Sequence, residues 1–230
     1  MRGADRNSSL MDSPGLEEMA DYFNVRAERY DALHLRSDIC WGLEVRERAA
    51  DLVPVSARDV LDLGAGTGIE IGRLLDRIPA ARIRCVDLSS GMLRVLKRKF
   101  PGENVLAEVA DFRTLDLPSN AHDAVLSVMA LHHLRPAEKL RLYRQVWRTL
   151  RPGGMFVNSD YIVDDFEQER ALRRRARDQR AGRSPELVFH LDVPMCEASE
   201  RRLLARAGFV DVDKAFENRK AKIVVARKSV

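Results

Sequence analysis

A glycine-rich loop directly after a buried strand is the feature that most constrains this chain. Residues 60–68 read VLDLGAGTG, so an apolar strand runs into Gly64, Gly66 and Gly68. Glycines let the backbone turn tightly and approach a ligand closely, and the N-terminus of the next helix offers free N–H groups to an anion. The dinucleotide fingerprint G-x-G-x-x-G would need a glycine where Ile69 stands. The loop therefore predicts a nucleotide-like ligand and disfavours a nicotinamide dinucleotide.

Short apolar runs alternate with amphipathic helices over residues 58–159. The runs predict five strands, at 58–63, 82–86, 104–109, 124–128 and 155–159. Helices are predicted between them, at 71–78, 92–100 and 136–150. Such alternation is typical of a parallel sheet covered by helices on both faces. The turn between the last two strands, 210–216 and 222–226, is too short for a crossover helix, so this pair should be an antiparallel hairpin. We expect an α/β fold with a doubly wound, seven-stranded, mostly parallel sheet in a single domain.

The composition excludes several classes of protein. A chain of 230 residues with 45% hydrophobic residues can bury a core without disulfides or metal ions. It contains no run near the ~18 apolar residues that a membrane helix needs, and no apolar segment typical of a secretory signal follows Met1. Cys40, Cys85 and Cys196 are widely spaced, which argues against a disulfide framework or a zinc site. We expect a reducing, cytoplasmic location and no membrane partner.

Acidic residues at the ends of the next two predicted strands extend the nucleotide pattern. Asp87 ends the second strand, where a carboxylate can accept hydrogen bonds from both hydroxyls of a ribose. Leu88 and Met92 follow it and can form an apolar wall for a base. Asp111 and Phe112 follow the third strand, where an acid can accept from an adenine amino group beside an aromatic ring.

Two further segments identify a family. Residues 123–134 read DAVLSVMALHHL and residues 150–157 read LRPGGMFV. With the glycine loop and the two strand-end acids, they resemble class I S-adenosylmethionine-dependent methyltransferases over residues 16–228. The resemblance implies a Rossmann-like fold, S-adenosyl-L-methionine as cofactor, S-adenosyl-L-homocysteine as product, and methyl transfer by in-line displacement. No Asn/Asp-Pro-Pro-Tyr motif follows the fourth strand, where residues 127–130 read SVMA, which disfavours amino-methyltransferases of bases and amides.

The resemblance also implies roles for residues around the cofactor. The loop at 64–68 would pass around the methionine portion, Asp87 would bind the ribose, and Asp111 and Phe112 would flank the adenine. The other residues expected at the cofactor are Asp62, Gly64, Ala65, Gly66, Thr67, Leu88, Met92 and Val128.

The N-terminal segment resembles a lid. Residues 21–31, DYFNVRAERYD, are similar to the lid of a broad small-molecule branch, which also includes the enzyme that carboxymethylates a tRNA uridine. Tyr30 and Trp41 are then candidates to close over the cofactor, although both could instead serve helix packing. The expected organisation is a flexible tail at 1–12, a helical lid at 13–54, a cofactor-binding core at 55–160, a helical insertion over the acceptor site at 161–195, and a C-terminal helix and hairpin at 196–230.

Residues on the acceptor side should follow the fourth and fifth strands, because ligands lie beyond the carboxyl ends of parallel strands. The catalytic candidates are His132, His133, Asp160 and Tyr161. Strand alternation does not decide which histidine points inward. His190 and Asp192 follow the insertion and can fold back over the same strand ends. His34 and His122 are expected on the surface. These residues have no recognisable metal-ligand spacing, so we expect no metal.

Arginines concentrate in one predicted helix. Residues 170–183 hold seven arginines against a single acid, in a chain whose net charge is +4. Leu172 and Ala176 are spaced i, i+4, so one face of this helix can dock on the domain. We expect a lid surface beside a small-molecule acceptor, in a monomer or a homodimer. Two alternatives stay open: an RNA (tRNA) modifying methyl- or carboxymethyl-transferase that binds its acceptor with the arginines, and a regulatory protein that binds the cofactor without turnover.

Overall fold

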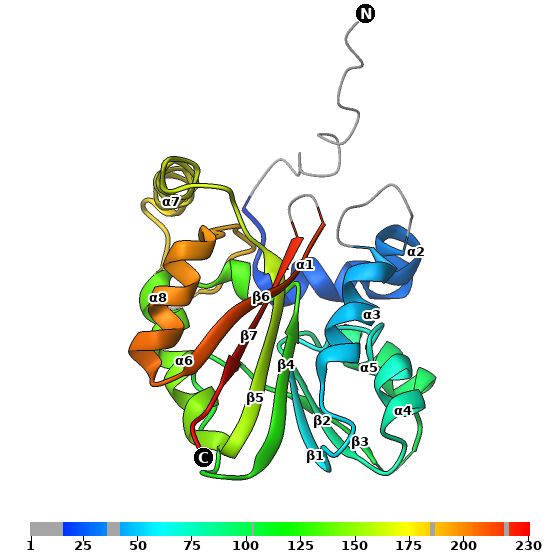
Figure 1. Ribbon diagram of the computed structural model, residues 1–230. Coiled ribbons are helices and arrows are strands. Elements are labelled where there is room, and N and C mark those ends of the chain that lie inside the picture. The colour runs from blue at the N-terminus through cyan, green and yellow to red at the C-terminus, as the bar shows by residue number, and fades with distance from the viewer. Residues whose placement is uncertain (1–15, 36–41, 103, 185–186, 219–220) are drawn as a thin grey trace, which may run out of the picture.

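A seven-stranded mixed sheet forms the centre of the computed structural model, which describes residues 16–35, 42–102, 104–184, 187–218 and 221–230. The strands are β1 (Asp59–Leu63), β2 (Arg82–Asp87), β3 (Val105–Val109), β4 (His122–Val128), β5 (Leu150–Tyr161), β6 (Val210–Asn218) and β7 (Ala221–Arg227). Their order across the sheet is β3-β2-β1-β4-β5-β7-β6, and the first five are parallel (Figure 1). β7 pairs antiparallel with both β5 and β6. The predicted fold class and the C-terminal hairpin are confirmed.

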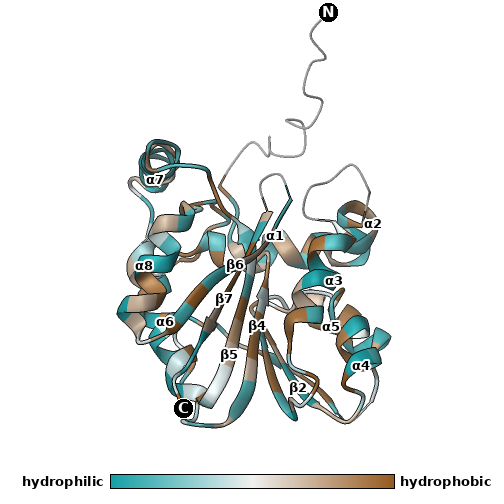
Figure 2. Ribbon diagram, viewed as in Figure 1, coloured by the Kyte–Doolittle hydropathy of each residue, from teal (hydrophilic) through white to brown (hydrophobic). Residues whose placement is uncertain are grey.

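Helices cover both faces of the sheet. One face carries α3 (Leu43–Leu52), α4 (Ile71–Arg77) and α5 (Ser90–Lys99), and the other carries α6 (Pro136–Thr149) and α8 (Glu197–Ala207) (Figure 1). Successive residues of a strand point to opposite faces, so Val60 packs in one core and Leu61 in the other. Both cores are apolar, and the strands between them are largely hydrophobic in Figure 2.

The N-terminal helices lie against α5 near the carboxyl ends of the parallel strands. They are α1 (Met19–Arg26), the 3-10 turn η2 (Ala27–Arg29) and α2 (Tyr30–His34). Asn24 ties α1 to α5, because its Oδ1 accepts from the Ser89 hydroxyl and from the Gly91 amide, both at 2.8 Å. A side chain at Gly91 would meet the Asn24 backbone at 3.1 Å. The predicted tail and Trp41 lie outside the described residues.

The insertion after β5 is a peripheral helix followed by an extended return. Asp165 is the N-cap of helix α7 (Phe166–Arg180), and its carboxylate accepts from the Gln168 amide at 2.9 Å. The helix is largely hydrophilic in Figure 2, and Ala176 is buried as its spacing predicts. Residues 188–195 then run back over the strand ends, where the Val193 amide donates to the His132 carbonyl at 2.8 Å.

Two sequence expectations differ from the structure. β5 begins at Leu150, so the strand starts five residues before the predicted range 155–159. His122 is buried rather than exposed, because it opens the central strand β4 and its Nδ1 lies 2.8 Å from the Thr149 hydroxyl. Among the described helices, none combines the length and the apolar character required to cross a bilayer.

Candidate active site

The glycine loop between β1 and α4 has the left-handed backbone that its sequence predicts. Gly64, Gly66 and Gly68 have φ angles of +77°, +53° and +71°. A Cβ at Gly64 would lie 2.3 Å from the Ala130 Cβ, whereas a Cβ at Gly66 would meet nothing within 4 Å. Gly64 is therefore needed for close packing on the end of β4. Gly66 presents bare backbone to open space, which suits the approach of a ligand.

Asp87 at the end of β2 anchors this loop. One carboxylate oxygen accepts from the Gly66 amide and the other from the Ser89 amide, each at 2.8 Å. Burial raises the pKa of Asp87, and these two amides oppose that rise. A carboxylate oxygen has two lone pairs, so each oxygen keeps acceptor capacity for a ribose hydroxyl.

Most of the predicted cofactor residues line one cavity. From this set the structure brings together Tyr30, Gly64, Ala65, Gly66, Thr67, Asp87, Leu88, Met92, Asp111, Phe112 and Val128, and His133 lines the same cavity. Met19 and Phe23 of α1 also line this cavity, so the N-terminal segment forms part of its wall. The Thr67 hydroxyl donates to Asp31 of α2, which links the glycine loop to the same segment.

Asp62 does not line the cavity. Its carboxylate is fully buried behind the loop and makes no hydrogen bond to the described residues. Burial, followed by the nearby Glu70 carboxylate, raises the pKa of Asp62 well above its usual range.

Arg46 of α3 lines the cavity, although no sequence motif marks it. Its Nη1 donates to Glu70 at 3.1 Å, while Nε and Nη2 are buried without a hydrogen-bond partner among the described residues. Burial opposes the charge, but Tyr30 and then Glu70 keep the pKa of Arg46 raised. A buried guanidinium with two unsatisfied nitrogens fits an anionic group of a ligand, such as the carboxylate of a methionine portion.

Asp111 and Phe112 also line the cavity. Asp111 is held by Arg113, whose Nε lies 2.9 and 3.0 Å from the two carboxylate oxygens. Partial burial opposes ionisation, yet Arg113 keeps the pKa of Asp111 below its usual value. Asp111 is therefore an oriented carboxylate at the cavity wall beside the Phe112 ring.

His132 is hydrogen-bonded to Asp160. The two residues come from η3 (Leu131–His133) and β5, and the His132 Nδ1 lies 2.6 Å from the Asp160 Oδ1. Burial disfavours the imidazolium, but Asp160 outweighs it and raises the pKa of His132. Asp160 is fully buried and Tyr161 is half-buried, with its ring 6.2 Å from the His132 ring, and neither lines the cavity. The structure therefore does not bring Asp160 and Tyr161 to the wall of this cavity.

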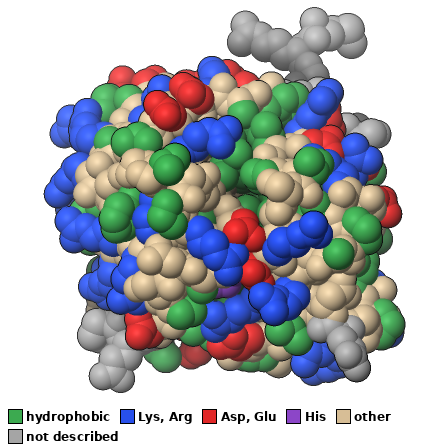
Figure 3. Space-filling model, turned by 60° about the horizontal axis from the view of Figure 1, so that its bottom comes forward, with side chains coloured by type: hydrophobic (Ala, Val, Ile, Leu, Met, Phe, Trp, Pro, Cys, Tyr) green, Lys and Arg blue, Asp and Glu red, His purple; other side chains and the backbone are tan. Residues whose placement is uncertain are grey.

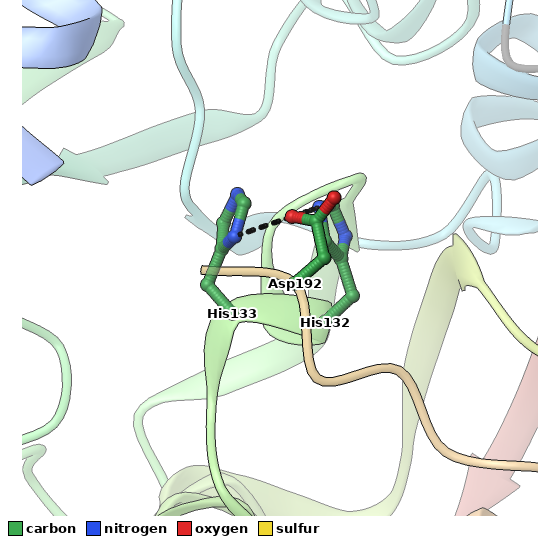
Figure 4. Close-up of side chains that lie close together, drawn as sticks. All are labelled: His132, His133 and Asp192. Carbon is green, nitrogen blue, oxygen red and sulfur yellow. Dashed lines mark ion pairs between the residues drawn. The ribbon is translucent and has the colours of Figure 1, made fainter. Parts of the chain in front are cut away.

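His133 lines the cavity, and its hydrogen bonds define its tautomer. Its Nδ1 lies 3.2 Å from both the Leu191 carbonyl and the Asp192 carboxylate (Figure 4). Both neighbours are acceptors, so the proton sits on Nδ1 and Nε2 keeps a free lone pair. Burial, followed by the charge on His132, lowers the pKa of His133, so the ring is neutral at neutral pH. Sequence alone left the choice between His132 and His133 open.

The return segment adds two groups that sequence reasoning placed only loosely. Asp192 lies 3.7 Å from the His132 Nε2, and His190 stacks on Tyr22 of α1 with ring centroids 3.6 Å apart. Ligand atoms of His132, His133 and Asp192 come within 4.8 Å of one another, close enough to hold a metal ion. Within this group the His133 Nδ1 lies 3.2 Å from the Asp192 carboxylate, which is a hydrogen-bond distance, so we interpret the group as a hydrogen-bonded cluster.

A second hollow of about 950 Å³ adjoins the cavity. It lies among α7, α8, the start of α6 and residues 188–195, and we call it the arginine groove because ten arginines line it. Arg113, His133 and Val188 line both hollows, so the groove and the cavity adjoin at these side chains. Figure 3 shows basic side chains spread over another face of the molecule, with acidic and apolar ones between them.

Comparisons with known proteins agree with this geometry. Residues 60–154 match the family model of a methyltransferase domain. The chain is 33% identical over 156 residues to a ubiquinone/menaquinone biosynthesis C-methyltransferase, UbiE, of Desulfotalea psychrophila, covering 66% of this chain and 60% of that protein. It is 31% identical over 153 residues to an uncharacterized methyltransferase of Bacillus cytotoxicus, covering 65% of this chain and 70% of that protein.

A solved structure shows the same fold. Human N-acetylserotonin methyltransferase in complex with S-adenosylmethionine superposes with a TM-score of 0.66 at 18% identity, covering 92% of this chain and 57% of that one. The chain spans 53–60% of the length of the first three curated relatives that it matches. The loop, the strand-end acids, the cavity and these likenesses agree, and the chain belongs to the class I S-adenosylmethionine-dependent methyltransferases.

Proposed function

We propose that this protein transfers a methyl group from S-adenosylmethionine to a small-molecule acceptor, with His133 removing a proton from the acceptor. One observation carries the proposal: His133 lies where the cofactor cavity meets the arginine groove, and its Nε2 is free to accept a proton. Direct displacement needs the acceptor in line with the methyl group, and an acceptor that carries a proton also needs a base.

The residues of the cavity fit the cofactor. Asp87 would accept from the ribose hydroxyls, and the bare backbone at Gly66 allows close approach. Arg46 would donate Nε and Nη2 to the carboxylate of the methionine portion, and Phe112 would pack on the adenine. When bound, S-adenosylmethionine supplies both the methyl electrophile and the leaving group.

His133 is suited to act as the general base. Its Nδ1 proton is shared between the Leu191 carbonyl and Asp192, which fixes the ring and its tautomer. Because burial lowers the pKa of His133, the unprotonated Nε2 is present at neutral pH. A base in this position typically contributes about 10²–10⁴-fold in rate.

His132, Asp160 and Asp192 act as positioning residues. Asp160 holds the His132 ring at 2.6 Å, and the His132 Nε2 faces Asp192 at 3.7 Å. Burial opposes ionisation of Asp192, but its contact with His133 and the charge on His132 lower the pKa of Asp192 strongly. The ionised Asp192 then stabilises the positive charge that His133 acquires when it takes a proton.

The small-molecule assignment is supported by the partial enclosure of the cavity. α1 forms part of its wall, and the Val188 carbonyl accepts from the Met19 amide at 2.7 Å, which joins the lid to the return segment. Relatives include a C-methyltransferase and a malonyl-[acyl-carrier protein] O-methyltransferase, so they do not indicate whether carbon or oxygen is methylated. The arginine groove also suits RNA, which keeps an RNA acceptor as the second candidate.

The test uses the wild-type chain with methyl-labelled S-adenosylmethionine and a metabolite extract, with and without RNase. We expect a labelled small molecule whose formation is insensitive to RNase and is lost in His133→Ala. Labelled RNA that disappears with RNase would establish the second candidate. Cofactor binding without any labelled product, from extracts of several sources, would indicate a regulatory protein.

A further inference from the structure

The arginine groove has an unusual balance of charge. Its lining includes ten arginines and two glutamates. Both glutamates are already engaged: Glu138 accepts from Arg135 at 2.8 Å, and Glu169 accepts from the Cys196 amide at 3.0 Å. The groove is therefore strongly positive, which favours an anion within it.

Helix α7 supplies half of these arginines from one of its faces. Arg170, Arg173, Arg174, Arg177 and Arg180 follow the i, i+3, i+4, i+7 spacing of a single helical face and all line the groove. Arg170 and Arg174 are exposed and lie beyond 4.0 Å from any carboxylate of the described residues, as does Arg206 of α8. Arg175, on the same helix, does not line the groove. The uncompensated positive charge is thus directed toward the groove.

The floor of the groove is apolar. Buried side chains of α7, α8 and the return segment line it: Ala176, Phe189, Val193, Met195 and Leu203. The Phe189 ring is covered by Arg180 and Arg183, whose guanidinium carbons lie 5.8 and 5.4 Å from its centroid. This ring is therefore not free to stack on a nucleotide base, which is the way that single-stranded RNA usually uses an aromatic side chain.

We infer that the arginine groove binds a methyl acceptor that carries a phosphate or diphosphate group on a partly apolar body. Guanidinium forks match phosphate oxygens, and the apolar floor matches a hydrocarbon portion. The junction at His133 places the opposite end of such an acceptor beside the base. The inference rests on the proposed function, since the ligand of the groove is its acceptor.

The first experiment measures binding by calorimetry with S-adenosylhomocysteine present and at roughly 0.15 M salt, where long-range attraction is screened. The probes are octyl phosphate, inorganic phosphate, octyltrimethylammonium and a single-stranded RNA. We expect octyl phosphate to bind more tightly than inorganic phosphate, and the cation not to bind. The double variant Arg170→Ala/Arg174→Ala should bind octyl phosphate at least about tenfold more weakly, since each charge-assisted contact contributes affinity of this order. Arg175→Ala is the matched control and should bind as wild type.

Two results would overturn the inference. One is equal affinity for octyl phosphate in wild type and the double variant, with S-adenosylhomocysteine affinity unchanged in both. The other is RNA binding tighter than octyl phosphate and lost in the double variant. A second experiment treats the metabolite extract with phosphatase before the labelling assay, and the labelled product should disappear. A labelled product that survives phosphatase would contradict the inference while leaving the proposed function intact, whereas no product from either extract would count against the proposed function.

Discussion

The imidazole of His132 donates its Nδ1 proton to the fully buried carboxylate of Asp160 over 2.6 Å, which joins the ends of β4 and β5. The bond turns the His132 Nε2 toward Asp192, which lies 3.7 Å away and also contacts His133. The positive charge of a protonated His132 is therefore held between the carboxylates of Asp160 and Asp192. Asp192 in turn contacts His133, which lines the cavity. Figure 4 shows how close these rings and Asp192 lie.

Asp160→Asn should lower the pKa of His132. Burial already disfavours the imidazolium, and the variant removes the carboxylate that outweighs this cost. Titration of the imidazole C–H resonances by NMR measures the shift. His122 is the internal control, because its pKa of about 4 arises first from burial at the other end of β4. An unchanged His132 titration, with His122 also unchanged, would show that Asp160 does not govern the charge of this cluster.

His133→Ala should reduce single-turnover methyl transfer by about 10²–10⁴-fold, the usual cost of losing a general base. Affinity for S-adenosylhomocysteine should change little, because in the proposed arrangement His133 contacts the acceptor. In the wild type, kcat/KM should be flat above neutral pH and fall on the acid side, since a lowered pKa keeps His133 neutral until the solution is acidic. His132→Gln is the comparison, with a smaller loss. A wild-type rate in His133→Ala would exclude the base role.

Sequence was most informative where structure is local. The Gly64–Gly68 loop, Asp87 and Phe112 are adjacent to the strands that position them, so their spacing predicts their neighbours. The parallel core of the sheet and its final antiparallel hairpin follow from the alternation of strands and helices together with the short final turn. Each of these features is predicted by the period of the hydrophobic pattern or by a few residues next to one another in the sequence.

Contacts between distant segments could not be obtained in this way. Asp160 is at a strand end, where a side chain can point to the cavity or into the core, and alternation alone does not fix the register. Arg46 lies on an amphipathic helix whose stripe predicts packing and gives no signal for a buried, unsatisfied guanidinium. His122 is buried because β4 is central, which depends on the complete sheet order.

Arg46→Met should weaken binding of S-adenosylhomocysteine by roughly tenfold or more while leaving 5′-methylthioadenosine, which lacks the amino-acid portion, nearly unaffected. Nε and Nη2 are available for the missing carboxylate, and each charge-assisted hydrogen bond contributes about 1.5–3 kcal/mol. Calorimetry with both ligands measures the difference, and the smaller ligand reports on whether the cavity remains intact. Equal losses for the two ligands would indicate that Arg46 supports the fold through Glu70 and does not bind the carboxylate.

Asp87→Ala should weaken S-adenosylhomocysteine about 10²-fold or more, because two hydrogen bonds from the ribose hydroxyls to a carboxylate are lost. The variant also frees the Gly66 and Ser89 amides, so Asp87→Asn is the matched variant that keeps one oxygen acceptor. We expect an intermediate affinity for Asp87→Asn. Calorimetry gives the affinities, and circular dichroism checks the fold. An unchanged dissociation constant in a folded Asp87→Ala protein would rule out the ribose role.

Buried histidines should make the protein less stable in mild acid. Burial lowers the pKa of His122 to about 4 and that of His190 to about 3. The unfolded chain, with an ordinary pKa near 6.5, therefore binds protons that the native state rejects. Their contribution to stability is present above pH ~6.5 and is lost as the pH falls toward 4. His132 affects stability in the opposite direction. Because its pKa is raised in the folded state, its contribution to the free energy of unfolding persists below pH ~6.5.

The decisive variant for this pH dependence is His122→Asn. The asparagine amide can still donate to the Thr149 hydroxyl, which is free to accept because it donates its own proton to the Pro118 carbonyl at 2.6 Å. Between pH 7.5 and pH 5, His122 should account for about 2 kcal/mol of the lost free energy of unfolding. Urea unfolding of both proteins at the two pH values should therefore show a smaller loss in the variant, with the part due to His133 and His190 retained. If the two proteins lose the same free energy over this range, His122 titrates normally in the folded state and its burial does not control its protonation.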